Sequence, residues 1–126
     1  MAEGLLLNEN RHLVRRELIY YLKLIDRQTG LELGRLGDIH TEGMLVFTSE
    51  PLPLQSVFKL LLKLPKTLAE EGFPELPVQA QTLWNRPGPR LSNYHENGLC
   101  FLDLTIKAQK TINRLTEFFA MPGKRS

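Results

Sequence analysis

Apolar and polar side chains alternate in short segments along most of this 126-residue chain, and this period of two constrains the fold more than any other feature. In residues 57–64 the apolar side chains at even positions face one way, whereas Lys59 and Lys63 mark the wet side. Because successive side chains of a strand point to opposite faces, such alternation predicts β-strands. The predicted strands cover residues 18–26, 31–36, 44–48, 57–64, 78–84 and 94–102. In the fifth of these, one face carries Val78, Ala80, Thr82 and Trp84.

The C-terminal segment changes to a helical period. Thr105 can cap the start of this helix, and a Pro-Gly pair at 122–123 ends it. The apolar stripe of the helix consists of Ala108, Ile112, Leu115 and Phe119. Six or so short antiparallel strands followed by one amphipathic helix predict a mainly β fold, a small barrel or a sandwich, with the helix over an open end or a sheet face.

Length and composition fit one domain that spans residues 1–126. We expect residues 1–17 to be a flexible basic lead-in and residues 121–126 a flexible tail. Residues 66–77 are predicted to form a long acidic connection between two strands, with one helical turn at residues 68–71. With 42% hydrophobic residues, the chain can bury a core without disulfides or metals.

Charge and motifs exclude several function classes. The net charge of +2 does not favour duplex nucleic acid or a membrane surface as a partner. The single cysteine, Cys100, lies in an apolar run and is expected to be a buried, inert thiol. No segment approaches the roughly 20 apolar residues of a membrane span, so we expect a cytoplasmic protein without membrane insertion. The sequence shows no metal-ligand spacing and no catalytic constellation, which predicts a protein that is not an enzyme and needs no metal or cofactor.

Positive charge is concentrated in an Arg-x-x-x-Arg motif, Arg11 to Arg15, which Arg16 follows directly. A guanidinium group is planar and can place two parallel hydrogen bonds on a phosphate or on a guanine O6/N7 edge. The motif therefore predicts anion or guanine binding. On spacing alone, a solvated basic lead-in remains an alternative.

A second motif, Asp-x-His-x-x-Gly at residues 38–43, is predicted to form a polar loop between two strands. Asp38 can fold its carboxylate onto the loop amides or accept hydrogen bonds from the N1–H and N2–H of a guanine. Gly43 can take a positive φ or allow a ligand to approach the backbone closely. An ordinary β-turn without a ligand is the alternative.

The two motifs in this order, one hairpin apart, resemble the PilZ domain family. The resemblance continues through Trp84-Asn85-Arg86, residues 98–101 and the C-terminal helix, and it covers about residues 11–119. It implies a six-stranded antiparallel β-barrel with a helix, and binding of the second messenger cyclic diguanylate (c-di-GMP). It also implies that Arg11 and Arg15, with Arg16 as a helper, clamp guanine edges and phosphates.

In that family's second motif, Asp38 and Gly43 match, whereas His40 stands where the family has serine. Imidazole is larger than a hydroxyl but can still donate or accept a hydrogen bond, so His40 is kept among the ligand-binding candidates. Trp84 sits where some members place a side chain against the ligand. The predicted c-di-GMP site thus consists of Arg11, Arg15, Arg16, Asp38, His40, Gly43 and Trp84.

The resemblance implies a non-enzymatic c-di-GMP receptor. Ligand binding would order the arginine loop and engage a partner protein that acts in motility, pili, biofilm formation or chemotaxis. A degenerate PilZ-like adaptor, which acts only through protein contacts, is the first alternative, and His40 motivates it. A barrel that binds single-stranded nucleic acid is the second alternative. That function needs a basic groove with exposed aromatic side chains, and the scattered aromatics and low net charge disfavour it.

Overall fold

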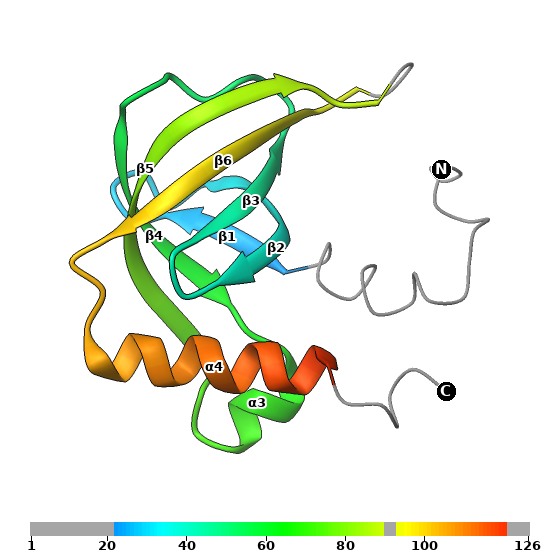
Figure 1. Cartoon of the computed structure of the whole chain (residues 1–126). Coiled ribbons are helices and arrows are strands. Elements are labelled where there is room, and N and C mark those ends of the chain that lie inside the picture. Colours follow the sequence, from blue (N-terminus) through cyan, green and yellow to red (C-terminus); the bar gives the residue numbers. More distant parts are fainter. Residues whose placement is uncertain (1–21, 90–92, 121–126) are drawn as a thin grey trace.

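Six antiparallel strands close into a barrel in the computed structural model, which describes residues 22–89 and 93–120, with side chains as far as residue 117 (Figure 1). The order around the barrel is β1-β2-β3-β6-β5-β4, and β1 pairs with β4 to complete the closure. The predicted six-stranded antiparallel barrel with a C-terminal helix is therefore confirmed. The strands are β1 (Lys23–Asp26), β2 (Glu32–His40), β3 (Gly43–Thr48), β4 (Val57–Lys63), β5 (Glu75–Pro87) and β6 (His95–Leu102).

Several predicted boundaries differ from the observed ones. Within the described residues, the first strand covers only Lys23–Asp26, and residues 18–21 of that prediction lie outside the described part of the chain. The strand β5 begins three residues earlier than predicted, because its ladder with β4 runs through Pro77, opposite Leu61. The predicted helical turn at 68–71 overlaps a short helix, α3 (Lys66–Glu70), which begins two residues earlier and ends one residue earlier than predicted.

The barrel interior is filled by the apolar faces of the strands. Leu60 and Leu62 are fully buried, whereas Lys59 and Lys63 on the opposite face of β4 are exposed, as the alternation predicts. A buried leucine contributes about 2 kcal/mol relative to an exposed one. The core therefore supplies the driving force that holds the six short strands together.

The helix α4 (Ile106–Ala120) lies across one end of the barrel beside α3 (Figure 1). Its first turn is capped as predicted, because the N–H of Ala108 donates to Thr105 Oγ1 at 3.0 Å. Ile112 and Leu115 are fully buried in the same cluster as the barrel core. Among residues 22–89 and 93–120, no helix is long and apolar enough to cross a membrane.

Three register shifts interrupt the ladders of the described strands, and two of them, at Gly37 in β2 and at Leu83 in β5, change which residues reach the outer face near β6. In β2 the partner of Leu36 is Val46, but the next pair joins Asp38 to Leu45. Because a bulge adds one residue to one strand, every side chain beyond it changes face. Leu36 therefore points into the barrel and Asp38 points out.

The bulge at Leu83 corrects one prediction. Alternation alone places Trp84 on the same face as Val78, Ala80 and Thr82, which are all buried. The observed pairs Thr82–Leu99 and Trp84–Gly98 leave Leu83 as the extra residue, so the prediction for Trp84 is wrong. Its indole lies on the outer face and is 42% exposed.

A buried asparagine fixes the register of β6 against β3. Asn97 is fully buried, and its Nδ2 donates to the carbonyl of Val46 at 3.0 Å and to Thr48 Oγ1 at 2.9 Å. Its Oδ1 accepts from the N–H of Leu52 at 3.0 Å, which ties the loop after β3 to the barrel. A buried amide with its donors and acceptor satisfied specifies one arrangement of the strands around it.

Candidate functional site

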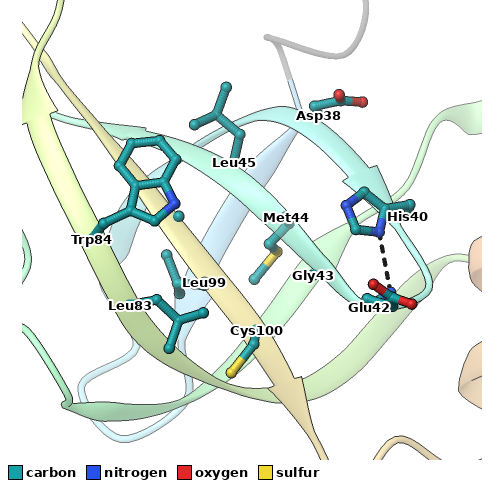
Figure 2. Close-up of a pocket in the computed structure, with 11 residues that line it drawn as sticks. Asp38, His40, Glu42, Gly43, Met44, Leu45, Leu83, Trp84, Leu99 and Cys100 are labelled. Carbon is teal, nitrogen blue, oxygen red and sulfur yellow. Dashed lines mark hydrogen bonds between the residues drawn. The ribbon is translucent and has the colours of Figure 1, made fainter.

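The outer face of β2, β3, β6 and β5 is hollowed into a pocket of about 340 Å³ (Figure 2). Segments far apart in the sequence meet there because the strand order places β6 between β3 and β5. The pocket is lined by Asp38, His40, Glu42, Gly43, Met44, Leu45, Leu83, Trp84, Gly98, Leu99 and Cys100.

Backbone pairing arranges the outward-facing residues of this pocket in two rows that cross the strands. The first row runs Asp38–Leu45–Gly98–Trp84, from β2 through β3 and β6 to β5. The second row runs His40–Gly43–Cys100 across the first three of these strands. Asp38 and Trp84 therefore stand on opposite walls of the pocket, with the two central strands β3 and β6 between them.

Each of the two central strands contributes one glycine to the pocket, Gly43 in β3 and Gly98 in β6. A Cβ at Gly43 would lie 2.3 Å from the carbonyl oxygen of Leu99, so the two backbones approach too closely for another residue. Gly43 does not need a positive φ. Among the described glycines, that conformation occurs at Gly30 and Gly72. A Cβ at Gly98 would lie 2.2 Å from Trp84 Nε1, which shows that the indole rests directly on the β6 backbone.

The first wall of the pocket is the end of β2, which corrects the predicted loop at residues 38–43. Residues 38–40 pair with residues 43–45 of β3, so only Thr41 and Glu42 form the turn. Asp38 Oδ1 accepts a hydrogen bond from the N–H of Ile39 at 2.9 Å. His40 Nδ1 accepts one from the N–H of Glu42 at 3.2 Å (Figure 2).

The opposite wall carries the aromatic group. The guanidinium carbon of Arg86 lies 5.1 Å from the centroid of the Trp84 ring, a cation–π contact. Arg86 Nε also donates to Glu96 Oε1 at 2.7 Å, which holds the guanidinium in place. Gly98 and Arg86 together fix the orientation of an indole that remains partly exposed to the pocket.

The charged side chains of the described pocket lining are acidic, and the guanidinium of Arg86 beside this lining is already paired with a carboxylate. Asp38 and Glu42 are the charged side chains among the described lining residues, and that set contains no lysine or arginine. Cys100 lines the pocket and is only partly buried, so the prediction of a buried thiol is wrong. Within residues 22–89 and 93–120, no group of His, Cys, Asp and Glu is placed to hold a metal ion.

Four predicted site residues, Asp38, His40, Gly43 and Trp84, line this one pocket. The arginines at positions 11, 15 and 16 lie outside the described residues. Sequence reasoning missed Leu45, Leu83 and Cys100, because their place in the pocket depends on strand pairing and on the bulges. The alternation in the sequence carries no signal that would have located them.

Comparison with known proteins identifies the family of this chain. The model of the PilZ domain matches residues 9–118, so the chain belongs to the PilZ domain family. A similar solved structure is the PilZ domain of YcgR from Escherichia coli, determined with c-di-GMP. It has a TM-score of 0.59 and 13% sequence identity, and the match covers 86% of this chain and 92% of that one. No curated protein matches the chain.

The contact between Trp84 and Gly98 predicts the effect of Gly98→Ala. The added methyl group must push the indole off β6, which should shift the fluorescence emission to longer wavelength and cost about 1 kcal/mol of stability. Trp84 is the single tryptophan, so intrinsic fluorescence reports on this site alone. Cys100→Ala on the same face of β6 is the control and should leave the emission unchanged. An unshifted spectrum for Gly98→Ala would contradict the described packing.

Proposed function

We propose that this chain is a non-enzymatic receptor for c-di-GMP, which binds on the pocket formed by β2, β3, β6 and β5. The observation that carries the proposal is the convergence of Asp38, His40, Gly43 and Trp84, which come from distant segments, on one hollow of the barrel surface. Membership of the PilZ domain family supports it, as does the likeness to a PilZ domain determined with c-di-GMP.

The chemistry of the two walls suits a guanine base. The Asp38 carboxylate can accept from both N1–H and N2–H of guanine, whereas adenine presents an acceptor at N1. Asp38 Oδ1 accepts a hydrogen bond from the N–H of Ile39, and among the described residues Asp38 Oδ2 has no hydrogen-bond partner. The flat, partly exposed indole of Trp84 offers a surface for stacking or edge contact on the other side.

The phosphates require a source of positive charge. The described lining is acidic, so this surface alone would repel a dianion. We propose that Arg11 and Arg15, with Arg16 as a helper, supply the guanidinium groups from the N-terminal segment. Ordering of that segment over the ligand would change the surface next to the barrel. A partner protein of the motility, pilus, chemotaxis or biofilm machinery would recognise that change.

Arg15→Ala should weaken c-di-GMP binding by about 2 kcal/mol, roughly 30-fold, because a charge-assisted contact to the ligand is lost. Isothermal titration calorimetry measures this change. Arg35→Ala is the matched control, since Arg35 is exposed, pairs with Glu32 and does not line the pocket. The proposal fails if the wild-type chain gives no binding heat at high micromolar c-di-GMP.

Asp38→Asn should lower the affinity for c-di-GMP by about 1.5 kcal/mol, because the amide accepts guanine N–H groups less strongly than a carboxylate. The amide oxygen can still accept from Ile39, so the fold should be unaffected. Asp26→Asn is the control, because Asp26 also accepts a backbone N–H, from Gln28 at 2.9 Å, but does not line the pocket. Equal c-di-GMP affinity of Asp38→Asn and wild type would exclude guanine recognition by Asp38.

The acidic lining also favours a second candidate function. Without cations at the pocket, the domain would be a PilZ-like adaptor that acts through protein contacts alone. His40→Ser separates the two candidates. If this variant binds c-di-GMP and the wild type does not, the natural protein is an adaptor whose pocket is closed by the imidazole.

A further inference from the structure

We infer that the β2–β3 turn holds His40 in one tautomer, so that its ring presents an N–H donor to the pocket. The inference rests on the proposed function for the identity of the ligand. In this role, one imidazole nitrogen accepts a hydrogen bond from the turn, and the other donates a hydrogen bond to the ligand.

The first step is the geometry of the turn. His40 pairs with Gly43, so the turn contains only Thr41 and Glu42. The N–H of Glu42 finds its acceptor in His40 Nδ1 at 3.2 Å. A side chain that accepts from the backbone N–H two residues further along is the arrangement that Ser, Thr, Asp and Asn form in turns. The imidazole therefore accepts the hydrogen bond within the turn that a hydroxyl could accept at this position.

The second step is the position of the proton. A ring nitrogen that accepts a hydrogen bond carries no proton, so neutral His40 holds its proton on Nε2. Figure 2 shows Nδ1 joined to Glu42, while the other ring nitrogen points away from the turn toward the side of the pocket where Leu45 and Trp84 lie. His40 is exposed and lines the pocket, so this N–H is accessible to a ligand.

The third step is complementarity. Asp38 and His40 are two residues apart on the same face of β2, about 7 Å from each other. Asp38 offers an acceptor and His40 a donor, beside the acidic Glu42. A guanine nucleotide carries N–H donors on its Watson–Crick edge, and acceptors at O6, at N7 and on its phosphates. His40 Nε2–H therefore donates to one of these acceptor atoms. The nearby carboxylates cannot do so, because an ionised carboxylate only accepts hydrogen bonds.

Hydrogen exchange of the ligand-free chain tests the turn contact without any ligand. The Glu42 amide should exchange about fivefold faster in His40→Ala and His40→Phe than in wild type, because its acceptor is removed. His40→Ser and His40→Asn keep an acceptor and should retain the protection. Thr41→Ala, in the same turn but outside the pocket lining, is the control. The ¹⁵N shifts of the neutral His40 ring should report a proton on Nε2, and a proton on Nδ1 would overturn the inference.

Calorimetry with c-di-GMP then tests the donor. His40→Phe keeps an aromatic ring, somewhat larger than imidazole, without either nitrogen and should bind about tenfold more weakly than wild type. His40→Asn and His40→Ser, which each keep a donor, should fall between His40→Phe and wild type. Wild-type affinity in His40→Phe would overturn the donor role.

Failure of the two proposals can be distinguished. If the wild type does not bind c-di-GMP while the Glu42 amide shows the expected pattern, the proposed function fails and the donor role fails with it, but the turn contact stands. If the wild type binds c-di-GMP and the Glu42 amide exchanges equally fast in all variants, the proposed function stands. The inference that the turn holds His40 in one tautomer is then wrong. Binding by His40→Ser alone would mean that imidazole blocks the pocket, which contradicts the inference.

Discussion

The candidate site depends on two extra residues, Gly37 in β2 and Leu83 in β5, each of which shifts its strand by one position against its neighbour. Without these bulges, Asp38 and Trp84 would point into the barrel, where an unpaired carboxylate is costly and an indole would have to displace packed leucines. With them, both side chains stand on the outer face, at the two ends of one cross-strand row. The shift in β2 returns Ile39 to the core, and the shift in β5 leaves Asn85 half-buried, where its Nδ2 donates to the carbonyl of Leu52 at 2.7 Å.

Rigidity of the floor follows from the closed barrel and from the close contacts at Gly43 and Gly98. Among the described residues, the floor strands β3 and β6 are paired on both sides, and the wall segments of β2 and β5 each pair with one of them. Asn97 also holds β6 to β3 from the interior. A surface held in this way can present its acceptor, donor and aromatic groups without a large ordering cost. The described lining residues nevertheless include no lysine or arginine, so we propose that two parts of the chain bind different parts of the ligand. The barrel recognises the base, and the N-terminal arginines neutralise the phosphates.

Much of the fold follows from local pattern. Alternation located all six strands, and the 3.6 period with the Thr105 cap located α4, because these signals depend only on near neighbours in the sequence. The bulges could not be predicted, since a bulge is a relation between two strands. For that reason alternation alone predicts the wrong face for Trp84 and a loop at Asp38. The motifs did select four residues that line one pocket, but the role of His40 in the turn required the geometry of the Glu42 amide.

The most direct test of the proposed site is a titration of the ¹⁵N-labelled 126-residue chain with c-di-GMP, followed by NMR. The account predicts shifts at the amides of residues 11–16, 38–45 and 97–100, together with the indole N–H of Trp84, which gives one signal because the chain has one tryptophan. Amides on α4 and on the outer face of β4 should remain unchanged. Shifts confined to α4, or an indole signal that does not move at saturating ligand, would contradict the account.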